Sequence, residues 1–116
     1  MTEEIDLVMA YERKQGRTPE DVSGEYKVGY DIKSNERLIE VKVRDIKYGF
    51  AFITKNEFST FLQNKNAYLY LVCYKDNKPI LKIFSRDVVL GNSQTEIRYR
   101  FQMRKLLKES TEIELS

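Results

Sequence analysis

The chain has 116 residues, the length of one domain, and its 41% hydrophobic and 33% charged residues are typical of a globular protein. It has no histidine and one cysteine, which excludes Ser–His and Cys–His catalysis and zinc sites built from imidazole or thiolate groups. The net charge of +2 is too small to indicate nucleic-acid binding by itself.

The N-terminal residues and the single cysteine indicate the cellular compartment. The acidic start, residues 1–4, lacks the basic residues that open a signal peptide. No apolar run approaches the roughly 20 residues that a membrane span needs. Cys73 has no partner for an internal disulfide, which agrees with a reducing environment. We therefore expect a single cytoplasmic domain over residues 1–116 that makes no contact with a membrane.

The first part of the chain predicts a helix followed by a polar connection. Apolar residues from Ile5 to Met9, and then Glu12, recur on one face of a 3.6-residue period, which predicts a helix over residues 3–15. Gly16 suits the end of that helix. Residues 17–27 are polar and contain Pro19, so they predict a loop or a short edge strand.

Residues 28–33 and 37–46 predict a β-hairpin that gathers charged side chains. A turn at residues 35–36 sets Asp31 opposite Glu40. Because the side chains of a strand alternate, Glu40 and Lys42 share one face whereas Ile39 points to the other. Two carboxylates that face each other repel. The pattern therefore predicts a divalent metal ion between them, with Lys42 beside it.

The second part of the chain predicts a helix and three strands. Thr54 and Glu57 form a capping-box pattern at the start of a helix, and capping alone accounts for Glu57. Residues 68–74 are almost all apolar and predict a central strand, followed by a turn at 76–77 and a strand over 80–84. Residues 85–93 read as a loop. Strict alternation over residues 97–104 predicts a strand with one basic face.

Asp31 followed by Glu40-x-Lys42 resembles the core motif of the PD-(D/E)XK nuclease superfamily, which has a restriction-endonuclease-like fold. The longer sequence pattern formed by residues 29–32 and 39–42 is similar to that of the nuclease-like domain at the C-terminus of NO VEIN-type proteins. The similarity extends over roughly residues 5–85. The order helix, strand, strand, helix, strand also fits. Tyr30 stands where the superfamily name has proline.

The resemblance implies an α/β fold with a central mixed sheet flanked by helices, and a nuclease that hydrolyses DNA phosphodiester bonds with Mg²⁺ or Mn²⁺. Asp31, Glu40 and the backbone carbonyl of Val41 would bind the metal, and Lys42 would orient water or stabilise the transition state. Glu12 is a further candidate, because some members of the superfamily carry a glutamate on this helix that reaches the metal. The alternative for Glu12 is a carboxylate at the helix end that escapes to solvent.

Four arginines are candidate contacts for DNA phosphates: Arg44, Arg98, Arg100 and Arg104. Arg44 continues the face of Glu40 and Lys42, and the other three lie in or next to the predicted basic strand. Phosphate binding is one interpretation of that strand, and a solvated basic face is the other.

Two alternatives to a DNA nuclease stay open. The domain could be a non-catalytic nucleic-acid- or protein-binding module that retains the fold. It could also be an RNA nuclease, which ranks lower because RNA cleavage through the 2′-hydroxyl commonly uses histidine. Since the chain is too short for a separate recognition domain, we expect specificity to come from a homodimer, from substrate structure or from a separate specificity subunit.

Overall fold

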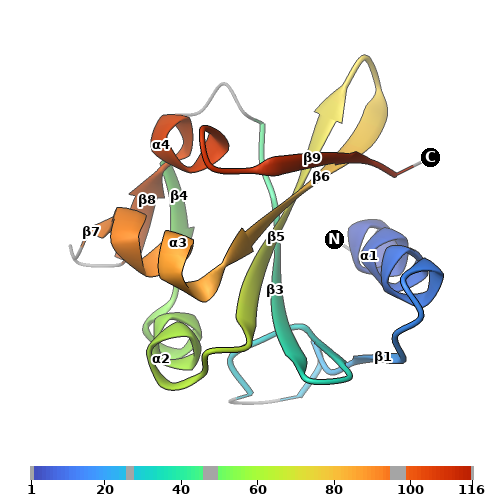
Figure 1. Cartoon of the computed structure of the whole chain (residues 1–116), viewed down its shortest axis with the longest axis horizontal. Helices are drawn as coiled ribbons and strands as arrows, with labels where there is room; N and C mark the ends of the chain where they lie inside the picture. The colour runs from blue at the N-terminus through green and yellow to red at the C-terminus, as the bar shows by residue number, and fades with distance from the viewer. Residues whose placement is uncertain (1, 26–27, 46–49, 95–98, 116) are drawn as a thin grey trace.

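The computed structural model describes residues 2–25, 28–45, 50–94 and 99–115. Its main sheet has helices on both faces, so the predicted α/β fold with a mixed sheet is confirmed (Figure 1). One helix, α1 (Thr2–Lys14), covers one face, and on the other face lie α2 (Lys55–Gln63), α3 (Arg86–Asn92) and α4 (Met103–Leu107). None of the described helices is long and apolar enough to cross a bilayer.

Within the described residues, the main sheet has six strands in the order β1 (Pro19–Asp21), β2 (Ile32–Ser34), β3 (Arg37–Val43), β5 (Ala67–Lys75), β6 (Lys78–Ser85) and β9 (Thr111–Glu114). The central strands β3 and β5 run parallel, and each of the other neighbouring pairs is antiparallel. A second sheet has three strands in the order β4 (Phe50–Ile53), β8 (Tyr99–Gln102) and β7 (Ser93–Gln94).

The hydrophobic core is divided between the two faces of the main sheet. On one face, Ile39 and Val41 of β3 pack with Val8 of α1. On the other face, Leu69 of β5 packs with Phe61 of α2. Because β5 is covered on both faces, its sequence is the nearly continuous apolar run that predicts a central strand.

The prediction of a loop over residues 85–93 is wrong, because this segment contains α3. The Ser85 hydroxyl accepts a hydrogen bond from the amide of Val88 at 3.3 Å and caps the helix. Val89 is fully buried against the core. A helix of two turns with a single fully buried side chain has too little periodicity to be recognised in the sequence.

The strand predicted over residues 97–104 is shorter in the structure. Residues 95–98 lie outside the described part of the chain, and β8 ends at Gln102. Met103 then begins α4, in which Met103 and Leu106 are buried. Arg104 therefore lies on a helix rather than on the predicted strand.

The predicted register of the hairpin is confirmed, since Ile32 faces Ile39. Its first strand is shorter than predicted, because Gly29 turns the chain with a φ of 82°. The Gly29 carbonyl accepts a hydrogen bond from the Thr60 hydroxyl of α2 at 3.0 Å, and a Cβ on Gly29 would lie 2.5 Å from that hydroxyl. Residue 29 is therefore glycine both for its conformation and for the close approach of α2.

Alanine substitutions at three glycines separate these two constraints. Gly16 has a similar φ of 83° but open space at its Cβ position, and Gly24 has neither constraint. We expect Gly24→Ala to change the free energy of unfolding by less than about 0.5 kcal/mol. Gly16→Ala should lower it by about 1 kcal/mol, and Gly29→Ala by more than about 2 kcal/mol, because it adds the steric clash. Urea denaturation measures all three, and equal losses at Gly16 and Gly29 would show that the approach to α2 is no constraint.

Candidate functional site

The second half of β3 lies along an edge of the sheet, because β2 pairs only with residues 37–39. The amides of Leu38 and Arg44 donate to carbonyls on the β5 side, those of Asn66 at 3.0 Å and Val72 at 3.1 Å. Alternate residues of a strand direct their backbone groups to opposite edges. Val41 therefore presents its N–H and its carbonyl to the edge that faces away from β5.

Asp31 occupies this edge although it lies just outside β2. Its amide donates to the carbonyl of Ile39 at 2.8 Å, and its carboxylate accepts a hydrogen bond from the amide of Val41 at 2.9 Å. The carboxylate is thus fixed beside β3 by the backbone on either side of Glu40. The structure brings Asp31 and Glu40 together, as the hairpin register predicts.

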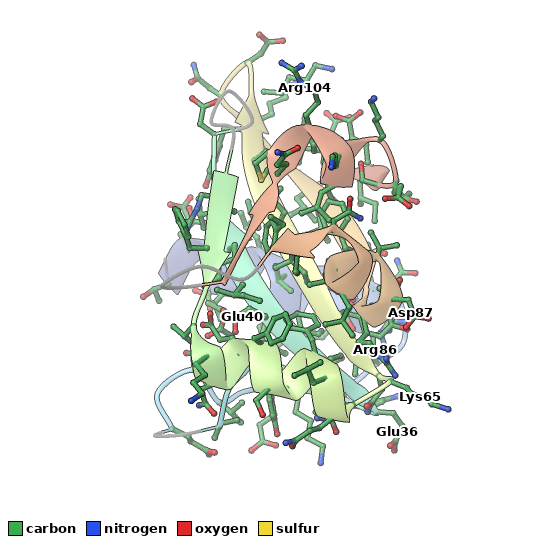
Figure 2. The ribbon with its side chains drawn as sticks, turned by 90° about the vertical axis from the view of Figure 1, so that its left-hand side faces the viewer. Glu36, Glu40, Lys65, Arg86, Asp87 and Arg104 are labelled. Carbon is green, nitrogen blue, oxygen red and sulfur yellow. The ribbon has the colours of Figure 1, made fainter. Side chains whose placement is uncertain are left out.

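Glu40 and Lys42 share the face of β3 that α2 covers, and Glu57 of α2 meets them there. The Lys42 ammonium lies 3.0 Å from Glu57 Oε1 and 3.6 Å from Glu40 Oε1. Glu40 is only 3% exposed. Figure 2 shows Glu40 beside α2. Three carboxylates and one ammonium therefore gather at the point where α2 meets β3 and the chain before β2.

The protonation of Glu40 reflects this crowding. Burial, together with the negative charges of Glu57 and Asp31, raises the pKa of Glu40 to about 10, although the Lys42 ammonium opposes the shift. Burial would also raise the pKa of Glu57, but the backbone N–H of Thr54 and the Lys42 ammonium hold it below its usual value. With no cation bound, Glu40 thus holds a proton at neutral pH whereas Glu57 is ionised.

These side chains line a cleft of about 510 Å³. Its lining holds more acids than bases: Glu4, Asp31, Glu40 and Glu57 against Lys42 and Arg44, together with Val41 and Val43. With Glu40 ionised, a cation of charge two would balance the excess. The ligands on offer are carboxylate and carbonyl oxygens, which suit Mg²⁺ or Mn²⁺ rather than zinc.

The donors for such an ion are few. Within the described ranges, no three side chains of histidine, cysteine, aspartate or glutamate are grouped so that they could hold a metal. The protein ligands would therefore be the carboxylates of Asp31 and Glu40 and the backbone carbonyl of Val41, which points to the same edge of β3. This donor set fits a hard divalent ion whose remaining ligands are water or substrate oxygens.

The structure does not bring Glu12 to the cleft. It lies on the α1 side of the sheet, opposite to Glu40, and is completely buried. Arg17 donates to its two oxygens at 2.5 and 2.8 Å, and the Tyr70 hydroxyl donates at 2.7 Å. Neither role predicted for Glu12 describes these surroundings, because the partly exposed Arg17 and the buried Tyr70 hydroxyl satisfy the carboxylate.

Two acidic residues of the cleft do not follow from the sequence pattern. Glu4, in the first turn of α1, lines the cleft and accepts a hydrogen bond from the Tyr74 hydroxyl at 2.6 Å. The capping-box pattern of Glu57 is confirmed, and it locates the start of α2. It gives no sign that this turn packs against Lys42, because that contact depends on tertiary structure.

The four arginine candidates separate in the structure. Arg44 lines the cleft, and its guanidinium donates to the carbonyl of Val43 at 2.7 Å. Arg104 is exposed on α4, well apart from Glu40 in Figure 2. Arg98 and the side chain of Arg100 lie outside the described residues. Of the candidates whose side chains are described, only Arg44 is placed at the cleft.

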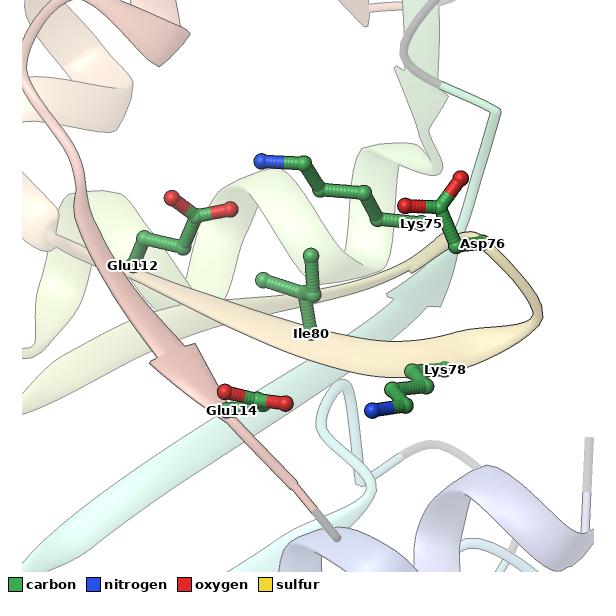
Figure 3. A pocket seen from close by; sticks show the side chains of 6 residues that line it. All are labelled: Lys75, Asp76, Lys78, Ile80, Glu112 and Glu114. Atoms are coloured by element: carbon green, nitrogen blue, oxygen red, sulfur yellow. The ribbon is translucent and has the colours of Figure 1, made fainter.

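A second hollow, of about 410 Å³, lies where the β5–β6 hairpin meets β9 (Figure 3). It is lined by Ile80 and by five charged side chains: Lys75, Asp76, Lys78, Glu112 and Glu114. All five are exposed. No charge here is desolvated as Glu40 is, so this hollow lacks the feature that marks the first cleft as a candidate active site.

The fold and the cleft define the class: a mixed α/β domain with a desolvated, acid-rich site and a lysine at the edge of a central strand. The chain matches the sequence model of a protein family described as Protein NO VEIN, C-terminal, over residues 3–84. This match covers more than half of the chain, so the protein belongs to that family, and the whole lining of the cleft lies within the matched range. A search of curated proteins finds no significant match. Membership of the PD-(D/E)XK superfamily stays a prediction.

Removing the carboxyl of Glu40 should change how stability depends on pH. In the unfolded chain this group loses its proton near pH 4.5, whereas in the folded protein it keeps the proton up to about pH 10. The folded state therefore binds more protons across this window. The contribution of the Glu40 carboxyl group to the free energy of unfolding is therefore complete below pH 4.5 and is lost as the pH rises towards 10. In EDTA, the free energy of unfolding of the parent should fall relative to Glu40→Gln by up to about 1.4 kcal/mol per pH unit.

Urea titrations between pH 5 and 9 measure this difference. The matched control is Glu36→Gln, an exposed glutamate in the adjacent turn, which should follow the parent at every pH. If Glu40→Gln and the parent remain parallel across the range, Glu40 is ionised in the folded protein and its site is more hydrated than the structure indicates.

Proposed function

We propose that the protein is a Mg²⁺- or Mn²⁺-dependent nuclease that hydrolyses phosphodiester bonds in DNA. The observation that carries this proposal is the arrangement of Glu40: a desolvated carboxyl group beside Asp31, with the Lys42 ammonium 3.6 Å away, in the lining of an acid-rich cleft. Paired carboxylates with a neighbouring lysine are suited to phosphoryl chemistry, because the substrate carries negative charge on its non-bridging oxygens.

Asp31, Glu40 and the carbonyl of Val41 would hold the metal ion. When bound, such an ion lowers the pKa of a coordinated water and neutralises the charge that develops on the phosphate. The proton that Glu40 holds would leave as the ion enters, since a ligand carboxylate must be ionised. Lys42 would donate hydrogen bonds to the attacking water or to a phosphate oxygen, and its partly buried position would strengthen that interaction.

DNA is proposed as the substrate because the resemblance to the PD-(D/E)XK nucleases implies it. Arg44 supports a polyanionic substrate, since it adds a second positive charge to the lining of the cleft. Sequence or structure specificity would come from a homodimer or from a separate specificity subunit.

Three conservative substitutions test catalysis. Asp31→Asn, Glu40→Gln and Lys42→Met keep the size of each side chain and remove its charge, so each should lower the rate of DNA cleavage by at least about a hundredfold. The assay incubates purified protein with plasmid and single-stranded DNA in Mg²⁺ or Mn²⁺. Glu36→Gln serves as the control of unchanged rate, because its side chain lies outside the cleft.

Two results would count against this function. Cleavage that persists in all three variants arises from another site or from a contaminant. Absence of cleavage by the parent, together with DNA binding that needs Arg44, would favour the alternative of a non-catalytic binding module. Parallel assays on RNA address the remaining alternative.

The arginines can be separated by their contribution to the salt dependence of DNA binding. In Ca²⁺, used to prevent turnover, the logarithm of the affinity should fall linearly with the logarithm of the salt concentration. Arg44→Ala should reduce that slope by about 1, the loss of one phosphate contact. Fluorescence anisotropy at several salt concentrations gives the slope. If Arg104→Ala reduces the slope and Arg44→Ala leaves it unchanged, DNA crosses α4 and not the cleft.

A further inference from the structure

We propose that Glu57 is a positioning residue that holds the Lys42 ammonium at the active site, and that it does not bind the metal. This inference rests on the proposed nuclease function and adds a residue to it from a different element of the fold. It assigns a second role to a glutamate whose part in the capping box already explains its place in the sequence.

One oxygen of Glu57 accepts from two donors. Oε1 lies 2.8 Å from the backbone N–H of Thr54 and 3.0 Å from the Lys42 ammonium. The Glu57 amide in turn donates to the Thr54 hydroxyl at 3.1 Å. The carboxylate is therefore held by the first turn of α2 before it meets the lysine. A flexible lysine side chain gains a fixed partner in this way.

A second hydrogen bond fixes the position of α2, and with it the contact between Glu57 and Lys42. The Thr60 hydroxyl, one turn further along the helix from Glu57, donates to the carbonyl of Gly29 at 3.0 Å. Gly29 lies two residues before Asp31. The same helix thus fixes the chain that leads into Asp31 and the ammonium of Lys42, and so sets the distance between two parts of the proposed catalytic machinery.

The geometry favours positioning over metal binding for Glu57. Of its two oxygens, Oε1 is already shared by an ammonium and an amide, and the described residues contain no cluster of three acidic side chains fit to hold an ion. The Lys42 ammonium is closer to Glu57, at 3.0 Å, than to Glu40, at 3.6 Å. The Lys42 ammonium is therefore paired more closely with Glu57 than with Glu40, the proposed metal ligand.

The variant that isolates this role is Glu57→Gln. Glutamine serves in a capping box as glutamate does, so the helix cap is retained while the charge that pairs with Lys42 is lost. The control for loss of helix stability is Gln63→Gly, which weakens α2 at its other, exposed end without touching the cleft.

We expect Glu57→Gln to lower kcat by about tenfold to a hundredfold, the effect of a misplaced catalytic group. KM and the affinity for Mn²⁺, measured by titration calorimetry, should stay within about threefold of the parent, since uniform binding is not affected. Gln63→Gly should lower the melting temperature and keep kcat within about twofold. A correlation spectrum of the lysine ammonium groups, with Lys42 assigned by its absence in Lys42→Met, should lose the Lys42 signal in Glu57→Gln.

Each contrary result has a distinct meaning. An unchanged kcat, or an equally ordered Lys42 ammonium, would overturn the positioning role, and a parallel loss of Mn²⁺ affinity would make Glu57 a ligand instead. If the parent cleaves no nucleic acid, the proposed function fails, yet the ammonium spectrum still decides whether Glu57 orders Lys42. Should Glu57→Gln fail to fold, Glu57→Asp, which keeps the charge on a shorter side chain, should show the same disordered ammonium.

Discussion

The close approach of α2 to the chain at Gly29 is the constraint on which the candidate site depends. The hydrogen bond from Thr60 to the Gly29 carbonyl leaves no room for a Cβ, so helix and chain meet at backbone distance. This contact sets the first turn of α2 over the face of β3 that carries Glu40 and Lys42. If α2 lay further from Gly29 by the width of a side chain, water would reach Glu40, and its carboxyl group would ionise as an ordinary surface group does.

Desolvation in turn explains why the cleft is chemically unusual. The excess of carboxylates would cost stability if all of them were ionised, and in the absence of a cation the protein avoids part of this cost by keeping Glu40 protonated. Such an arrangement is hard to explain as packing, because an apolar residue at position 40 would fill the same place without repulsion. A buried carboxyl group whose ionised form is destabilised in this way is typical of sites that bind a charged ligand.

The parts of the structure that follow from the sequence are those set by local geometry. The register of the hairpin, the capping box at Thr54 and the buried strand β5 each depend on residues that lie close together in the chain, so alternation and spacing were sufficient to predict them. The helix α3, the burial of Glu12 with Arg17 and the contact of Glu57 with Lys42 depend on which elements pack together. The periodicity of a single sequence contains no information about such contacts, so it does not predict these features.

The two buried glutamates on opposite faces of the sheet show how surroundings decide the role of a residue type. Burial acts against the charge of both. For Glu12, hydrogen bonds from Arg17 and Tyr70 overcome it and keep the pKa below its usual value, and Arg37 extends the network by donating to the Tyr70 hydroxyl at 2.8 Å. Glu40 has carboxylates as neighbours and a more distant lysine, so its charge is not compensated by the protein. A carboxylate that the protein itself neutralises joins α1 to the sheet, whereas one left without compensation at a cleft is suited to bind a cation.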